Sequence, residues 1–197
     1  MKMIVVNGSP NPQGNTATLL QAVVDELEKN QVTVQWLQAA ELIASARHPF
    51  CTACSTPCSA VCYKGTNLEQ AFDDISQADA VIFGSPVYFG TVSGQLKAFF
   101  DKTRKIRGQK AWLGLPASAV TTGASRFGGQ ETTVRALHDM MLVQGMTVLG
   151  DGHIEHDCGH FGASAQRPVD QDQDGLLRAK ILAKRMMEAA RQYKQRK

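Results

Sequence analysis

Four cysteines, Cys51, Cys54, Cys58 and Cys62, lie within twelve residues of the stretch HPFCTACSTPCSAVCYKG. The chain has five cysteines, so no other part of it has more than one. Thiolates gathered on a short loop can ligate a [4Fe-4S] cluster or a tetrahedral zinc ion. In a reducing compartment such a group is more typical of metal binding or redox chemistry than of disulfides. Reduced thiols that hold no metal are the third alternative.

A polar loop near the N-terminus, NGSPNPQGNT, separates an apolar run from a helical pattern. Backbone amides and short hydroxyls at the start of a helix can bind a phosphate. The loop contains no lysine or arginine, and its spacing matches neither a Walker-type loop nor the dinucleotide-binding pattern. The candidate phosphate-binding residues are Ser9, Asn11, Asn15 and Thr16. A polar turn capped by Asn15 or Thr16 is the alternative.

Two further stretches suit a flat heteroaromatic ligand. In GSPVYFGTVSGQLKAFFDKT, the residues Pro86, Tyr88 and Phe89 place rigid and aromatic groups at the end of an apolar run, and Gly90 allows close backbone approach. In TTGASRFGGQE, glycines and hydroxyls can direct hydrogen-bond donors at the polar edge of the same ring.

Hydrophobic periodicity predicts alternating strands and helices. Strand patterns cover 2–8, 32–37, 78–86, 111–123 and 145–150. Helical patterns cover 15–30, 67–77, 93–106, 130–144 and 174–193, the last capped by Asp172 or Asp174. The fold class is therefore α/β: a flavodoxin-like, doubly wound, five-stranded parallel sheet of order 2-1-3-4-5 with helices on both faces. Ligands of such sheets bind beyond the carboxyl ends of the strands, where the three polar loops fall.

The 197 residues, 43% of them hydrophobic, predict a single domain over 1–197 with a Cys-rich insertion at about 48–66. Long loops are expected over 38–66 and 150–173. The net charge is only +3, and much of the excess lies on the last helix, so no nucleic-acid partner is expected. No apolar run approaches the length of a membrane span, and we expect a cytoplasmic protein with no membrane contact.

Three stretches, GSPNPQGNT, GSPVYFGTVSGQLKAFFDKT and TTGASRFGGQETTVRALHDMMLVQGMTVLG, resemble the flavodoxin-like NAD(P)H-dependent FMN reductases over most of the chain from Met3 to Gly150. The resemblance implies that FMN binds with its phosphate on the first loop. The residues implied there are Ser9, Asn11, Asn15 and Thr16. The resemblance also implies an isoalloxazine ring that contacts Pro86, Val87, Tyr88, Phe89 and Gly90 on one side and Thr122, Gly123, Ala124, Phe127 and Gly128 on the other.

The cysteine window, together with FDDISQADAVIFGSPVYFG downstream, resembles the iron-sulfur flavoproteins of this family. The spacing here is C-x2-C-x3-C-x3-C, whereas the subgroup usually has a shorter second gap and a longer last one. The resemblance implies that the four cysteines ligate a [4Fe-4S] cluster, with zinc or no metal as the open alternatives.

The implied activity is transfer of electrons from NAD(P)H through FMN, and by way of the cluster where one is bound, to a quinone, a flavin or another small acceptor. No protein side chain is expected to be catalytic, because the cofactor carries the reaction. A non-enzymatic electron carrier is the alternative, although such carriers are usually strongly acidic. A colourless, zinc-stabilised binding protein is a third reading. The resemblance also implies a homodimer or homotetramer.

A second group of metal-capable side chains lies in HIEHDCGHFG, which contains His153, His156, Asp157, Cys158 and His160. Their order matches no zinc-site spacing. We expect a loop near the flavin or a subunit contact there, and assign no residue a role.

Overall fold

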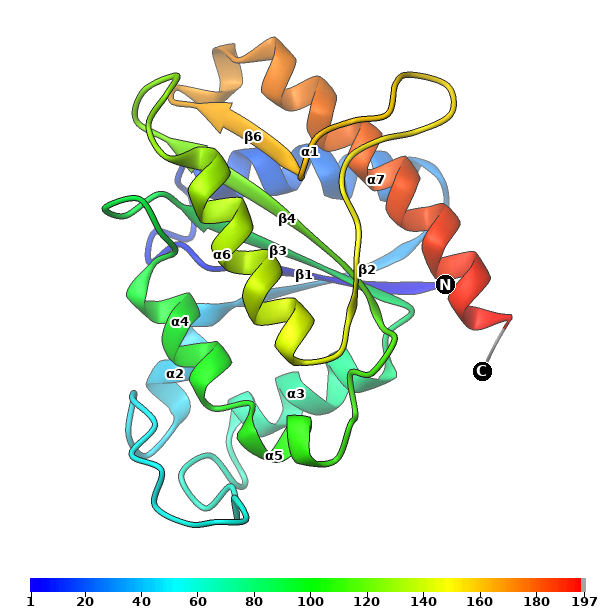
Figure 1. Ribbon diagram of the computed structural model, residues 1–197. Coiled ribbons are helices and arrows are strands. Elements are labelled where there is room, and N and C mark those ends of the chain that lie inside the picture. Colours follow the sequence, from blue (N-terminus) through cyan, green and yellow to red (C-terminus); the bar gives the residue numbers. More distant parts are fainter. Residues whose placement is uncertain (196–197) are drawn as a thin grey trace.

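The computed structural model describes residues 1–195, and strands and helices alternate along them (Figure 1). The strands are β1 (Lys2–Asn7), β2 (Thr33–Gln38), β3 (Ala80–Pro86), β4 (Pro116–Gly123), β5 (Thr147–Val148) and β6 (Ala163–Gln166). The helices are α1 (Asn15–Lys29), α2 (Ala39–Ser45), α3 (Asn67–Gln77), α4 (Gly94–Asp101), α5 (Arg104–Gly108), α6 (Gln130–Val143) and α7 (Gln173–Lys194), with a 3-10 turn, η1 (Val169–Gln171), before the last.

Neighbouring strands are parallel, and the strand order is β2-β1-β3-β4-β5, which confirms the predicted 2-1-3-4-5 sheet. The fifth position is divided between two short strands. β5 pairs with Pro116 and Ala117 at the start of β4, whereas β6 pairs with Val120–Gly123 at its end. Residues 149–162 leave the sheet between them. β6 lies inside the loop predicted over 150–173, because a four-residue strand of small side chains gives no strand periodicity.

Alternation along the central strands divides the core into two layers, since successive side chains of a strand point to opposite faces. Val81 and Phe83 of β3 belong to one layer, and Ala80 and Ile82 to the other. Helices α2, α3, α4 and α6 cover the first face, and α1 and α7 cover the second (Figure 1). Both faces are covered, as the doubly wound prediction requires.

Three elements depart clearly from their predicted bounds. The strand predicted over 145–150 is reduced to β5, Thr147–Val148. The helix predicted over 93–106 is broken, because α4 ends at Asp101 and α5 begins at Arg104. The strand in 111–123 begins only at Pro116, since turns occupy the residues before it.

The loop predicted over 38–66 begins with α2, and the remainder, residues 46–66, contains neither helix nor strand. That remainder includes the predicted Cys-rich insertion. The cap of α7 is Asp172, one of the two predicted residues, whose carboxylate accepts a hydrogen bond from Gly175 N at 3.0 Å. Among the described residues, none of the helices has both the length and the apolarity needed to cross a bilayer.

Candidate functional site

Three loops meet at the carboxyl ends of the central strands, where doubly wound sheets bind their ligands (Figure 1). The first loop is residues 8–14 after β1, the second is residues 87–93 after β3, and the third is residues 124–129 after β4. Thr16 Oγ1 lies 2.8 Å from Thr122 Oγ1, and Val87 N donates to Thr122 O at 2.9 Å. Thr122, at the end of β4, thus contacts both Thr16, which follows the first loop, and Val87 of the second loop.

Short side chains set the path of the first loop. Ser9 N donates to Asn7 Oδ1 at 3.0 Å, and Asn11 N donates to Ser9 Oγ at 3.1 Å. No side chain caps the N-terminus of α1, and its first turn contains no acidic residue. Unpaired backbone N–H groups at a helix start attract anions. The loop and the helix start together fit a phosphate group.

The predicted phosphate residues are placed differently. Ser9 and Thr16 are buried, whereas Asn11 and Asn15 are exposed. Asn15 Oδ1 accepts a hydrogen bond from Val169 N at 3.0 Å, so this side chain also holds η1 against α1. Asn15 therefore has a structural contact in addition to its predicted role.

Two polar residues that the sequence reasoning missed lie beneath the first loop. Gln38 Nε2 donates to Ser9 O at 2.5 Å. Asn7 Nδ2 and Gln38 Oε1 are buried and have no hydrogen-bond partner among the described residues. Because buried polar atoms are nearly always paired, these two atoms fit contact with a polar group of a ligand or with water. The sequence feature that could have identified these two residues is their position at the ends of β1 and β2.

The second loop contains a tight turn that holds two aromatic rings in solvent. Tyr88 N donates to Thr91 O at 2.9 Å, and Thr91 N donates back to Tyr88 O at 3.2 Å. Phe89 has φ +50° and Gly90 φ +78°, the signs of a type I′ turn. A left-handed phenylalanine costs roughly 1–3 kcal/mol. The Tyr88 side chain is 44% exposed and Phe89 is fully exposed, a placement that suits stacking on a flat ligand.

The third loop packs against the second. Gly129 has φ +94°, and a Cβ there would lie 3.2 Å from both Gly90 Cα and Val87 Cγ1. A side chain at this position would be strained, because the conformation and the contact each disfavour it. The predicted residues Thr122 and Gly123 are buried at the end of β4. Of the other three, Ala124 and Phe127 are exposed and Gly128 is half-buried.

Gln130, which the sequence reasoning missed, shapes the third loop. Its Oε1 accepts a hydrogen bond from Gly128 N at 2.8 Å, and its Nε2 donates to Ser125 O at 2.6 Å. The N–H of Gly128 is therefore used within the loop. A cavity of about 1030 Å³ opens on the far side of this loop, and Phe127 and Gln130 line it together with residues of β6 and α7. Its lining includes Arg126 and Phe127 of the third loop but no residue of the first or second loop. The cavity therefore adjoins the three-loop crevice without being part of it.

The cysteine loop, residues 46–66, lies away from the three-loop crevice, beside the distal end of α4 (Figure 1). Arg104 Nη2 of α5 donates to Thr56 Oγ1 at 3.3 Å. Cys51 lines a cavity of about 420 Å³ together with residues of α4, α5 and α6. The four cysteines are free thiols, of which Cys54 is exposed and the others are half-buried.

The sulfur atoms of this loop do not form a close group. Among residues 1–195, no three of the cysteine Sγ atoms lie within 4.8 Å of one another. Zn–S bonds of about 2.3 Å would place tetrahedral ligands roughly 3.8 Å apart.

Two buried residues that the sequence reasoning missed provide polar hydrogens beside the cysteines. Lys102, 1% exposed, donates from Nζ to Cys62 Sγ at 3.6 Å. The Tyr63 hydroxyl is buried without a hydrogen-bond partner among the described residues. Burial raises the pKa of Tyr63, and the neighbouring Cys58 and Cys62 add smaller upward shifts, so the hydroxyl stays protonated at neutral pH. An ammonium and a hydroxyl near Cys58 and Cys62 fit an anionic metal-sulfur centre.

A parallel sheet of this order, covered on both faces and carrying three polar loops at its carboxyl edge, defines a flavodoxin-like α/β protein. The comparisons with known proteins narrow this class. Residues 1–159 match the family described as NADPH-dependent FMN reductase. An iron-sulfur flavoprotein of Methanocaldococcus jannaschii is 32% identical over 200 residues, which cover 98% of this chain and 100% of that protein.

Two further comparisons cover the fold and part of the sequence. An NAD(P)H dehydrogenase (quinone) of Geobacter sulfurreducens is 38% identical over 78 residues, which are 40% of this chain and 38% of that one. The solved structure of a WrbA-like flavodoxin protein from Agrobacterium tumefaciens aligns with TM-score 0.70 at 22% identity over 98% of each chain, which supports the fold alone.

The chain belongs to the NADPH-dependent FMN reductase family, and within it to the iron-sulfur flavoproteins. It is therefore a flavin-dependent oxidoreductase, and the resemblance inferred from the three loops is confirmed.

Proposed function

We propose that this oxidoreductase binds FMN in the three-loop crevice, takes electrons from NAD(P)H and delivers them to a quinone, a flavin or another small acceptor. Bound FMN supplies the ability to accept a hydride and to release electrons singly. The observation that carries the proposal is the 2.8 Å contact between the Thr16 and Thr122 hydroxyls, because it brings the phosphate loop to the strand end beside the ring loops. The quinone dehydrogenase relative supports a quinone as acceptor.

The first loop binds the phosphate in this proposal. The uncapped N-terminus of α1 offers backbone N–H groups, and Ser9 and Thr16 add hydroxyls from buried positions. Asn11, which is exposed, adds a side-chain amide. No lysine or arginine is needed, because the helix start and the hydroxyls provide the donors.

The second and third loops position the ring. Tyr88 and Phe89 are held by the tight turn, so their rings can stack on a flat ligand with little loss of side-chain entropy. Backbone N–H groups at the start of the third loop, next to Gly123, would stabilise negative charge on the polar edge of a bound ring. Gly128 contributes only its backbone surface, because its N–H is bonded to Gln130.

The cavity beside Phe127 is the proposed binding region for the nucleotide donor. Arg126 and Arg167 line it, and guanidinium groups recognise phosphates by bidentate hydrogen bonds. Arg167→Ala is expected to raise the KM for the nucleotide while FMN stays bound.

The fully exposed rings of Phe89 and Phe127 also support assembly as a homodimer or homotetramer that covers them.

The cysteine loop is the proposed site of a [4Fe-4S] cluster held by Cys51, Cys54, Cys58 and Cys62. Lys102 and Tyr63 provide a positive charge and a hydroxyl beside it. This loop and the second loop lie at opposite ends of α4. The eight residues of this helix give it a length of about 12 Å.

Purification without oxygen tests both cofactors at once, by the visible spectrum and by iron, sulfide and zinc analysis. We expect flavin absorption together with about four irons per chain, the content of one [4Fe-4S] cluster. Cys58→Ser is expected to remove the iron and keep the flavin, whereas Cys158→Ser, at an exposed cysteine outside the loop, keeps both.

Flavin without iron would leave an FMN reductase and refute the cluster. A colourless protein would refute the FMN site itself.

A further inference from the structure

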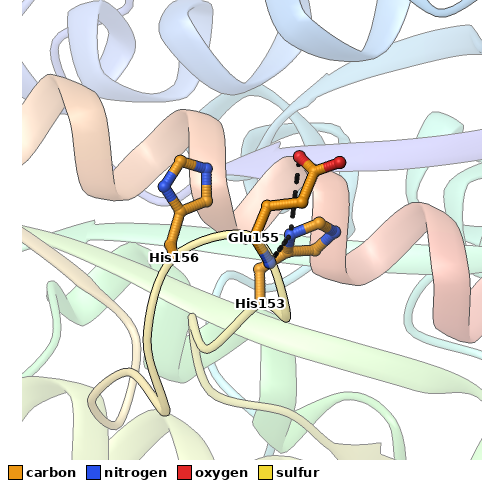
Figure 2. Close-up of side chains that lie close together, drawn as sticks. All are labelled: His153, Glu155 and His156. Atoms are coloured by element: carbon orange, nitrogen blue, oxygen red, sulfur yellow. Dashed lines mark hydrogen bonds and ion pairs between the residues drawn. The ribbon is translucent and has the colours of Figure 1, made fainter.

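The loop between β5 and β6, residues 149–162, gathers side chains that the proposed flavin chemistry does not use. One ligand atom each of His153, Glu155 and His156 lies within 4.8 Å of the other two. Among the described residues, no other three metal-capable side chains lie this close together. Figure 2 shows Glu155 above the His153 ring, with His156 beside them on the same turn of the loop.

The His153 imidazole is oriented by contacts on both of its nitrogens. Nε2 lies 3.2 Å from Glu188 Oε1 of α7, and Nδ1 faces Glu155, with Oε2 at 3.9 Å. Glu155 N donates to Nδ1 at 3.2 Å, which places the ring proton on Nε2 and the lone pair on Nδ1 (Figure 2). A histidine whose remote N–H points at a carboxylate is the usual arrangement of a metal-binding histidine.

The loop is also fixed in place before any ion binds. Arg178 of α7 contacts the buried carboxylate of Asp151 and reaches Asp157 at 2.9 Å. His153 N donates to Asp157 O at 3.0 Å, and His156 N to His153 O at 2.9 Å. The ligand residues therefore lie on a turn whose backbone and base are hydrogen-bonded, which limits the entropy that binding must overcome.

We propose that His153, Glu155 and His156 form a binding site for a divalent transition-metal ion, with Zn²⁺ as the ion it fits best, and that Glu188 positions His153. Two imidazoles and one carboxylate are a set that zinc accepts while keeping a fourth position for water. Zn–N bonds of about 2.0–2.1 Å place ligand atoms roughly 3.3 Å apart, so small side-chain rotations close the site. The ion replaces the Glu155 N–H at His153 Nδ1.

One cation competes with this ion. Lys184 Nζ lies 3.0 Å from Glu155 Oε2, so metal binding must displace the ammonium or use the other carboxylate oxygen. Lys184→Met is therefore expected to tighten binding. His160, an exposed histidine of the same loop with a 71% exposed side chain, lies outside the group and serves as the matched control.

Equilibrium dialysis of the protein as purified without oxygen against buffered Zn²⁺ tests the site, with zinc and iron measured in the same samples. Unchanged iron shows that zinc has not replaced the cluster. We expect one zinc per chain beyond any held before dialysis. His156→Ala should abolish this zinc, and Glu188→Gln should weaken it by about 10–100-fold, the usual effect of losing a partner that orients a ligand.

His160→Ala and Cys158→Ser are expected to bind zinc as the wild type does. The proposal is overturned if the wild type takes up no added zinc, if His156→Ala retains it, or if either control variant loses it to the same degree. As a second readout, zinc should raise the unfolding temperature of the wild type and leave that of His156→Ala unchanged.

Discussion

Lys102 Nζ lies 3.6 Å from Cys62 Sγ, and the lysine is almost completely buried. The two residues come from different segments, one just past the end of α4 and the other from the cysteine loop. A buried ammonium favours any state of its surroundings that carries more negative charge. The contact therefore predicts an electrostatic effect on a centre bound by that cysteine.

Lys102→Met should lower the reduction potential of the proposed cluster. In the variant, the Lys102 ammonium no longer stabilises the additional negative charge of the reduced cluster. A unit charge at roughly 7–10 Å in an effective dielectric of about 20 corresponds to a shift of about 70–100 mV. A redox titration followed by EPR measures it. Lys29→Met is the control, since that lysine is exposed at the end of α1, on the opposite face of the sheet. Equal potentials in wild type and Lys102→Met would contradict the prediction.

Gly129→Ala should destabilise the protein by about 1–3 kcal/mol and weaken FMN binding, because the left-handed conformation and the contacts with Gly90 and Val87 both disfavour a Cβ. Gly94→Ala is the matched control, since nothing lies within 4 Å of its added Cβ and the residue begins α4. Denaturant unfolding and flavin fluorescence titration provide the two measurements. Identical behaviour of the two variants would show that the loops do not pack in this way.

Tyr88→Ala should reduce the FMN retained on purification, because the tight turn holds this partly exposed ring in the second loop, where we propose that the flavin binds. Leu113→Ala removes an exposed apolar side chain near the opposite end of β4 and should retain flavin as the wild type does. The ratio of flavin absorbance to protein concentration gives the answer. Full occupancy in Tyr88→Ala would remove this residue from the ring site.

His138 predicts a pH dependence of stability. Burial lowers its pKa below the ordinary 6.5, and its Nε2 is buried without a hydrogen-bond partner among residues 1–195. The unfolded chain therefore binds the proton more readily than the folded protein does. The free energy of unfolding is unaffected by this group well above pH 6.5 and falls as the pH drops below it.

Urea unfolding at pH 7.5 and at pH 5.5 measures this effect of His138. His138→Phe keeps a ring next to Phe161 and should lose less stability on acidification than the wild type. His48→Phe, at an exposed loop position, should follow the wild type. A wild-type slope in His138→Phe would assign the pH dependence to other groups.

The sequence alone determined the sheet and the edge at which its ligand residues gather. Strands such as IVV in β1 and VIF in β3 are buried on both sides, and a continuous apolar run records that burial locally. Because parallel strands require crossover helices, their alternation predicts the order and places the three polar loops at one edge. The four cysteines could likewise be recognised from the sequence, because all of them lie within one short segment.

Only the tertiary structure decided the contacts between segments far apart in the chain. β6 is a strand because it pairs with β4, and its four residues have no strand pattern of their own. Lys102 meets Cys62 across 40 positions, and His153 of the loop after β5 meets Glu188 of α7, by packing that no local spacing encodes. The left-handed Phe89 likewise depends on the turn that closes between Tyr88 and Thr91, a conformation that phenylalanine by itself disfavours.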